Sequence, residues 1–116
     1  MKTLRTPETE QRYRAYRRGL PAGSGCVLCE REAVMTFTYW KIVTNEFPYD
    51  YIASRHDMIL PLRHVTEQEL TEDELAELKE IKDTYIDTEY GFILQGTHRT
   101  MSLPSHFHLH LINLLA

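Results

Sequence analysis

Histidine alternates with apolar residues in a run near the end of the chain, His-Phe-His-Leu-His-Leu at positions 106–111. A β-strand points successive side chains to opposite faces, so His106, His108 and His110 would share one face, with neighbours about 6.6 Å apart. The apolar residues between them would pack on the other face and fix the register. A helix would scatter the same imidazoles around its axis. The run therefore predicts a strand over residues 106–114 with a one-sided histidine cluster.

Three kinds of chemistry use such a cluster. Neutral imidazoles bind metal ions, and an imidazole held in one tautomer can attack an electrophile. Closely spaced imidazoles also repel one another when protonated, which would make a pH switch. The alternative without function is the polar outer face of an edge strand. Exposed strand faces normally mix lysine, glutamate and threonine, so three histidines in a row favour a functional site.

The segments before this run predict the fold class. Residues 33–45 are rich in β-branched and aromatic side chains and predict one long strand, or a hairpin bent near Trp40. Residues 57–62 and 91–95 predict two further short strands. Strands before and after one helical segment are typical of an α+β domain with an antiparallel sheet.

The clearest helix lies between these strands. Two successive capping boxes, Thr66-x-x-Glu69 and Thr71-x-x-Glu74, precede apolar residues at helical spacing. The helix should run to about Glu89, with a glycine shortly after its end.

A second helix is predicted at the N-terminus, with Thr6 as the N-cap and Pro7 at the first helical position. It should extend through Arg18, so we expect a helical extension with its loop over residues 1–23 and the main domain over residues 24–116. Residues 1–18 hold six basic and two acidic side chains. The simpler interpretation of this charge is a solvated helix face. The alternative is an arm that contacts phosphate.

Composition excludes several classes of protein. A chain of 116 residues that is 42% hydrophobic and 26% charged is typical of one globular domain. The net charge of −4 argues against a nucleic-acid partner. No apolar run approaches the roughly 20 residues of a membrane span, and the first residues lack the apolar region of a signal peptide. We therefore expect a cytoplasmic protein without a membrane partner.

The two cysteines, Cys26 and Cys29, form a CxxC motif. Without an export signal a structural disulfide is not expected, which leaves zinc, a redox pair or two thiols without a role. A thioredoxin-like pair needs a βαβ context, and the sequence predicts none. A tetrahedral zinc site needs two more ligands, for which the candidates are one histidine of the run and the other three histidines, His56, His64 and His98.

These features together resemble the histidine triad (HIT) family of nucleotide hydrolases and transferases. Its signature of three histidines alternating with apolar residues matches SHFHLHLI at residues 105–112. The segment 45–49 resembles the family's N-x-x-P loop, and MILPLRH at residues 58–64 resembles its strand ending in Pro-x-x-His. Gln95 lies where relatives place an amide that contacts phosphate, and the CxxC resembles that of zinc-bearing members. The resemblance covers residues 24–114 and leaves the N-terminal helix outside.

The resemblance implies a HIT-like antiparallel sheet with one main helix, a purine nucleotide or nucleotide conjugate as substrate, and a homodimer. It implies a hydrolase, phosphoramidase or nucleotidyltransferase in which His108 attacks the α-phosphorus and forms a covalent nucleotidyl-histidine. In this scheme His110 helps to bind the phosphate oxygens, Asn45 binds the ribose and Gln95 binds a phosphate oxygen.

The resemblance also implies a structural Zn²⁺ site. Its ligands would be Cys26, Cys29, His64 and His106. His106 would then be a structural metal ligand as well as a member of the catalytic triad. His56 and His98 are expected to be loop residues without an assigned role.

One departure from the family bears on catalysis. Relatives commonly carry serine or threonine three residues before the first triad histidine, where the hydroxyl helps to protonate the leaving group. Leu103 stands there in this chain, so Ser105 or Ser102 is the candidate to take its place at the substrate. Two alternatives to the enzyme follow: a nucleotide-binding protein with weak catalysis, and a zinc-stabilised interaction protein in which the triad has lost its function.

Overall fold

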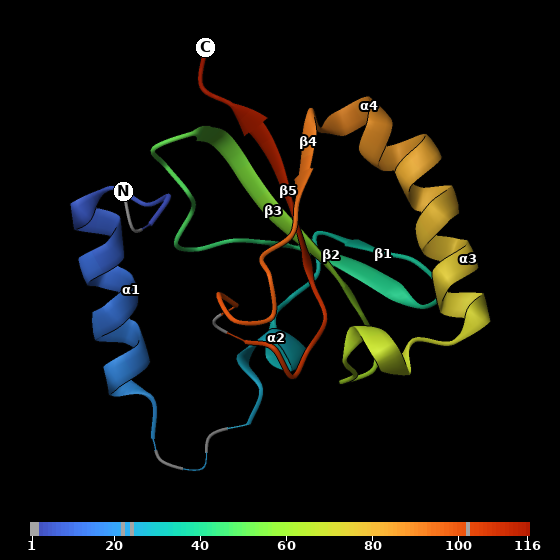
Figure 1. Cartoon of the computed structure of the whole chain (residues 1–116), viewed down its shortest axis with the longest axis horizontal. Coiled ribbons are helices and arrows are strands. Elements are labelled where there is room, and N and C mark those ends of the chain that lie inside the picture. The colour runs from blue at the N-terminus through green and yellow to red at the C-terminus, as the bar shows by residue number, and fades with distance from the viewer. Residues whose placement is uncertain (1–2, 22, 24, 102) are drawn as a thin grey trace.

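The computed structural model describes residues 3–21, 23, 25–101 and 103–116. They form a five-stranded sheet in the order β1-β2-β3-β5-β4, in which every neighbouring pair is antiparallel. The elements are α1 (Pro7–Gly19), α2 (Val27–Glu30), β1 (Met35–Thr36), β2 (Trp40–Thr44), β3 (Ala53–Pro61), η1 (Glu67–Glu69), α3 (Glu72–Ile81), η2 (Lys82–Ile86), α4 (Asp87–Glu89), β4 (Phe92–Leu94) and β5 (Leu109–Leu114). Figure 1 shows α1 and α3 on opposite sides of this sheet. The α+β class with an antiparallel sheet, one main helix and an N-terminal helix is therefore confirmed.

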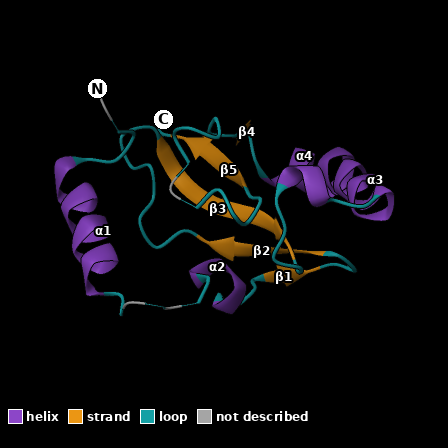
Figure 2. Cartoon of the chain, turned by 60° about the horizontal axis from the view of Figure 1, so that its bottom comes forward, coloured by secondary structure: helices purple, strands orange, loops and turns teal. Residues whose placement is uncertain are grey.

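The side-chain alternation of the strands divides the core between the two faces of the sheet. One face carries Trp40, Ile59 and Leu109, which pack in one cluster with Leu78 and Ile81 of α3. The other face carries a smaller cluster of Val43, Met58, Leu60 and Leu28, the last from α2. Figure 2 shows α2 beside the sheet, away from α3. The second face holds the triad, because His110 pairs with Met58 across β3 and β5.

The main helix begins where the second capping box predicts. The Thr71 hydroxyl accepts a hydrogen bond from the Glu74 N–H, and the Glu74 carboxylate accepts one from the Thr71 N–H. The helical segment continues as a π-helical turn, η2, and ends with α4 at Glu89. The first capping box, at Thr66, starts the short 3₁₀ turn η1 instead of the helix. The carbonyl of Glu74 accepts a bond from the buried Trp40 indole at 2.8 Å, which fixes α3 on the sheet.

Of the two alternatives predicted for residues 33–45, the structure shows the hairpin, β1–β2. The strand predicted at residues 57–62 needs a correction, because it begins four residues earlier, at Ala53. The early part of this strand is polar and shows no apolar periodicity, which is why the sequence did not predict it. Asp57 is buried there, and its carboxylate accepts hydrogen bonds from Tyr90 at 2.5 Å and Arg55 at 3.2 Å. His56 also lies in this strand and is buried, so its assignment to a loop was wrong.

The strand predicted at residues 106–114 pairs with its neighbours only from Leu109 onward. The residues just before it are buried too, and the Phe107 N–H donates to the carbonyl of Val65 at 2.7 Å. Phe107 and Leu109 pack in the cluster under α3, whereas the histidines face the other way. The alternation therefore holds over the whole run, although ladder pairing covers only its second half.

The N-terminal helix α1 begins at the predicted cap. The Thr6 hydroxyl accepts a bond from the Thr9 N–H, and Pro7 occupies the first helical turn. The helix does not stand apart from the domain, because Tyr13 and Tyr16 place their rings 5.4 and 5.2 Å from the ring of Phe47. No helix among the described residues has the length and apolar character that crossing a bilayer requires.

Candidate active site and metal cluster

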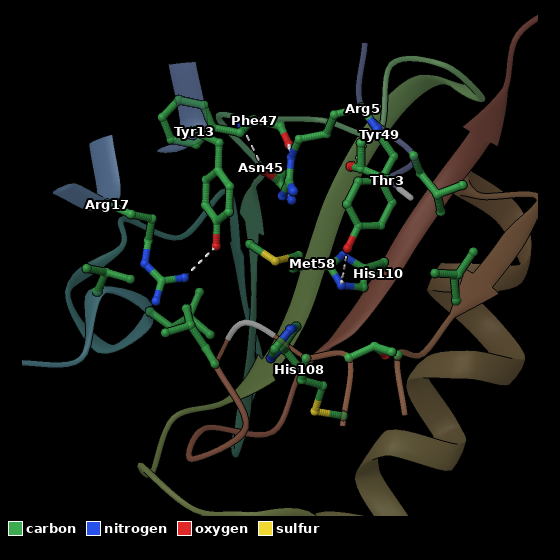
Figure 3. Close-up of a pocket in the computed structure, with 18 of the residues that line it drawn as sticks. Thr3, Arg5, Tyr13, Arg17, Asn45, Phe47, Tyr49, Met58, His108 and His110 are labelled. Atoms are coloured by element: carbon green, nitrogen blue, oxygen red, sulfur yellow. Dashed lines mark hydrogen bonds between the residues drawn. The ribbon is translucent and has the colours of Figure 1, made fainter. Parts of the chain in front are cut away.

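The sheet register brings His108 and His110 to one face, next to a histidine of the neighbouring strand. The ring centres of His108 and His110 lie 5.1 Å apart, and those of His110 and His56 lie 4.9 Å apart. All three histidines are at least nine-tenths buried. Figure 3 shows the rings of His108 and His110 among the residues that line a cavity. The volume of this cavity is about 400 Å³.

His108 is held in a single tautomer by the backbone. Its Nδ1 lies 2.9 Å from the carbonyl oxygen of His106, an atom that can only accept. Nδ1 must therefore carry the proton, and Nε2 keeps its lone pair. Because His108 lines the cavity, the arrangement presents an imidazole prepared for nucleophilic attack.

His110 belongs to a hydrogen-bond chain with His56 and Tyr49. The backbone N–H of Tyr49 donates to His56 Nδ1 at 2.9 Å, so a neutral His56 carries its proton on Nε2. That Nε2 donates to His110 Nδ1 at 2.8 Å. The proton of His110 then lies on Nε2, which is 3.3 Å from the Tyr49 hydroxyl. The chain assigns His110 as a hydrogen-bond donor on the cavity side.

Burial keeps these imidazoles neutral. Desolvation, followed by the positive charge of Arg5, lowers the pKa of His56 from 6.5 to about 4. Desolvation and the neighbouring histidines His56 and His108 lower the pKa of His110 to about 3. Desolvation also lowers the pKa of His108. At pH 7 the site therefore contains neutral nucleophiles and donors.

Part of the cavity wall is apolar. It includes Val27 and Leu28 of α2, together with Phe47 and Met58. A cavity with both apolar and polar wall residues suits a small molecule with an aromatic and a charged part.

Of the three residues predicted to contact the substrate, one lines the cavity and two do not. Asn45 lines the cavity, and its side-chain oxygen accepts a bond from the Phe47 N–H at 2.8 Å. Gln95 instead donates to Glu67 at 3.1 Å and lines a separate hollow. Ser105 is exposed and lines neither this cavity nor that hollow. The arrangement supports the prediction for Asn45 and gives no support for Gln95 or Ser105.

Leu103, at the position where relatives commonly have a hydroxyl, also lines the cavity. Its side chain packs against the apolar cluster that contains Leu28 and Met58. A hydrocarbon at this place has no proton to give a leaving group. Ser102, the other serine considered for this part, lies outside the described residues.

The predicted metal ligands Cys26, Cys29, His64 and His106 come together. Their four ligand atoms all lie within 4.8 Å of one another. Cys26 Sγ is 3.4 Å from His106 Nδ1, and Cys29 Sγ is 3.3 Å from His64 Nδ1. A tetrahedral zinc site with bonds of about 2.0 to 2.3 Å has ligand–ligand edges of roughly 3.3 to 3.8 Å. The four residues therefore fit one tetrahedral ion.

The surroundings orient two of these ligands. His106 Nε2 lies 3.0 Å from the carbonyl of Pro61, which holds the proton there and leaves Nδ1 for a metal ion. Lys41 donates to the carbonyls of Cys29 and Arg31 at 3.3 and 2.8 Å, which fixes the end of α2. Cys26 is the N-cap of α2, so the CxxC spans one short helix.

Sequence reasoning missed three residues of the site. His56 was assigned to a loop, Tyr49 was read only as part of a loop motif, and Arg5 lies outside the family resemblance. His56 and Tyr49 contact His110, Arg5 lies over the ring of Tyr49, and Tyr49 and Arg5 line the cavity. For Arg5, the signal in the sequence was the excess of basic residues in the first eighteen positions.

Two solved structures are similar to this chain. A HIT family hydrolase from Clostridium thermocellum superposes with a TM-score of 0.53 at 18% sequence identity, over 77% of this chain and 90% of that one. A HIT family hydrolase from Legionella pneumophila Philadelphia 1 superposes with a TM-score of 0.49 at 20% identity, over 77% and 92%. No protein-family model and no curated protein matches the sequence. The first of these structures shows that the chain has the HIT fold.

Proposed function

We propose that this chain is an enzyme of the HIT family that acts at the α-phosphate of a purine nucleotide or nucleotide conjugate, as a hydrolase, phosphoramidase or nucleotidyltransferase. The observation that carries the proposal is the geometry of His108. Its Nδ1 proton is held by the carbonyl of His106 at 2.9 Å, while the ring lines the cavity. A nucleophilic imidazole needs both a fixed tautomer and an open path to its electrophile.

In the first step the lone pair of His108 Nε2 attacks the α-phosphorus. A nitrogen–phosphorus bond forms, and the bond from phosphorus to the leaving group breaks. The leaving group keeps the bonding electron pair and takes up a proton from solvent water, since Leu103 offers none. The imidazole becomes positively charged as its lone pair is shared, and the carbonyl of His106 stabilises this charge through Nδ1–H.

In the second step water or another alcohol attacks the same phosphorus. The bond to Nε2 breaks, the attacking oxygen loses its proton, and His108 returns to its neutral form. The Nε2–H of His110 donates to a phosphate oxygen in both steps, because His56 holds the other nitrogen of that ring. Asn45, which lines the cavity, would bind the ribose hydroxyls.

A structural zinc ion is part of the proposal. The four residues of the predicted metal site, Cys26, Cys29, His64 and His106, would hold it. The ion would fix α2 against the backbone that precedes β5. No step of the reaction passes through the ion.

Leu103 supports a second candidate function, a nucleotide-binding protein with weak catalysis. The side chain occupies the wall of the cavity and offers no proton to the leaving group. Binding and the fold would then persist while turnover is slow.

Intact mass spectrometry after incubation with a panel of nucleotides and adenosine phosphoramidates tests the proposal. We expect an acid-labile adduct of one nucleoside monophosphate on the chain, absent from His108→Ala and retained by His98→Ala. His98 is an exposed histidine outside the cavity and serves as the matched control. Binding without an adduct or turnover would support the weak catalyst. An adduct that His108→Ala still forms would refute His108 as the nucleophile.

A further inference from the structure

The N-terminal segment forms one wall of the cavity above the histidines. Residues of α1 and of the turn before it, among them Arg5 and Tyr13, line the same cavity as His108 and His110. Figure 3 shows Tyr13 and Arg5 directed towards the space in front of these histidines. The segment therefore forms part of the cavity wall, although the sequence predicted a helical extension outside the main domain.

A partly buried group of hydrogen bonds holds this wall in place. The carboxylate of Asp50 accepts bonds from the Thr6 N–H at 2.8 Å, the Thr6 hydroxyl at 3.0 Å and the Thr9 hydroxyl at 2.5 Å. Asp50 thus satisfies the N-terminus of α1 from the loop that follows Asn45. The side-chain bonds to Thr9 and Thr6 lower the pKa of Asp50, against its desolvation, so the carboxylate is charged at pH 7. The position of α1 is specified by these bonds.

Arg5 lies where this wall meets the histidine chain. Its guanidinium carbon is 4.1 Å from the ring centre of Tyr13 and 5.0 Å from that of Tyr49. The Tyr49 ring centre is in turn 4.9 Å from that of His110. Arg5 Nε donates to the carbonyl of Phe47 at 2.7 Å, and its side chain is only 11% exposed. A cation is therefore fixed between two aromatic rings at the edge of the cavity.

This charge is only partly compensated. Glu10, the acidic partner, has an oxygen 3.5 Å from Arg5 Nη1, and that carboxylate also accepts bonds from Thr3 and Arg14. The charge of Arg5 reaches the histidines, because it contributes to the lowered pKa of both His56 and His110. A fixed cation that disfavours protonated histidines favours an anion in the same place.

We propose that the N-terminal segment is part of the nucleotide site, and that Arg5 is a binding residue for the negative charge of the ligand's phosphates. The inference rests on the proposed function and deepens it. A guanidinium is suited to this part because its planar fork matches phosphate oxygens. The six basic residues of the first eighteen then include at least one with a binding role.

Calorimetric titration of the whole protein with adenosine, AMP and ADP tests this proposal. We expect Arg5→Gln to weaken AMP binding about ten- to a hundredfold, as for a lost charged hydrogen bond, and to change adenosine binding by less than about twofold. Arg18→Gln removes the same charge from an exposed position of α1 outside the cavity, and should bind all three ligands like the unmodified chain. A similar loss for AMP and ADP places Arg5 at the α-phosphate, whereas a larger loss for ADP places it at the outer phosphate.

Arg5→Lys separates binding from a structural role. Lysine loses the Nε–H bond to Phe47, as glutamine does, but keeps the positive charge. We expect this variant to bind AMP more tightly than Arg5→Gln and to retain part of the preference for AMP over adenosine, because the charge remains while the planar fork is lost. Equal affinities of Arg5→Gln and Arg5→Lys for AMP, or an equal loss for adenosine and AMP, would overturn the proposal. An unmodified chain that binds none of the three ligands would overturn the proposed function as well.

Discussion

The buried pair of His56 and His110 makes the stability of the protein depend on pH. Both side chains are less than a tenth exposed, and desolvation is the main cause that lowers their pKa from 6.5 to about 4 and about 3. In the unfolded chain both imidazoles return to a pKa near 6.5. As pH falls below 6.5, the unfolded state therefore binds protons that the folded state does not. Stability is complete above pH 6.5 and is lost as pH falls towards 4.

The magnitude follows from the unfolded state, because both folded pKa values lie well below pH 5.5. One imidazole with a pKa of 6.5 stabilises the unfolded chain by about 1.4 kcal/mol at pH 5.5. The pair should therefore reduce the free energy of unfolding by about 3 kcal/mol between pH 8 and pH 5.5. That is a large part of the roughly 5 to 15 kcal/mol by which a domain is stable.

Urea unfolding at pH 8.0, 6.5 and 5.5 measures this loss. The double variant His56→Gln with His110→Gln is expected to lose about 3 kcal/mol less over the same interval, and each single variant about half of that. The other histidines and the metal cluster are present in every chain, so their contribution cancels in the comparison. Equal pH dependence of the double variant and the unmodified chain would refute the reasoning.

Three further predictions concern the metal cluster, the cavity and the main helix. Cys26→Ser should reduce bound zinc from about one equivalent to well below half, and lower the melting temperature, as elemental analysis and calorimetry would show; full zinc content would contradict the ligand set. Leu103→Ser should raise turnover several-fold with unchanged AMP affinity, as steady-state kinetics would show; unchanged turnover would contradict the lack of a proton donor. Glu74→Gln should destabilise the fold by about 1 to 2 kcal/mol in urea at pH 7, because Arg63, itself half exposed, lowers the pKa of Glu74 to about 2. The unmodified chain should lose this contribution as pH falls from 4.5 to 2, and an equal loss in the variant would contradict it.

Local sequence signals predicted much of the fold. The alternation at residues 106–111 identifies both the histidine face and the core face, because strand geometry fixes which side chains share a side. The capping box at Thr71 marks the start of α3, because it satisfies backbone groups within four residues. The local signals left open which histidines join Cys26 and Cys29; the family resemblance named His64 and His106, and the four residues are neighbours in the structure.

The rest of the site depends on contacts between distant segments. His56 lies in a polar stretch, and its burial results from the pairing of β3 with β5 and from its bond to His110. Gln95 was placed by its distance along the chain, but its amide bonds to Glu67 of η1 instead of turning into the cavity. Arg5 is brought to the site by the bonds between α1 and Asp50. No pattern within either segment contains that information.

His106 serves two neighbouring structures through different atoms. Its ring faces the two thiols, and its carbonyl oxygen holds the proton of His108. A substitution at the cysteine pair would therefore affect the cavity, because a shift of the backbone at His106 moves the carbonyl that orients the ring of His108. The cysteine pair and the histidine face of the sheet are therefore connected through the side chain and the backbone of a single residue.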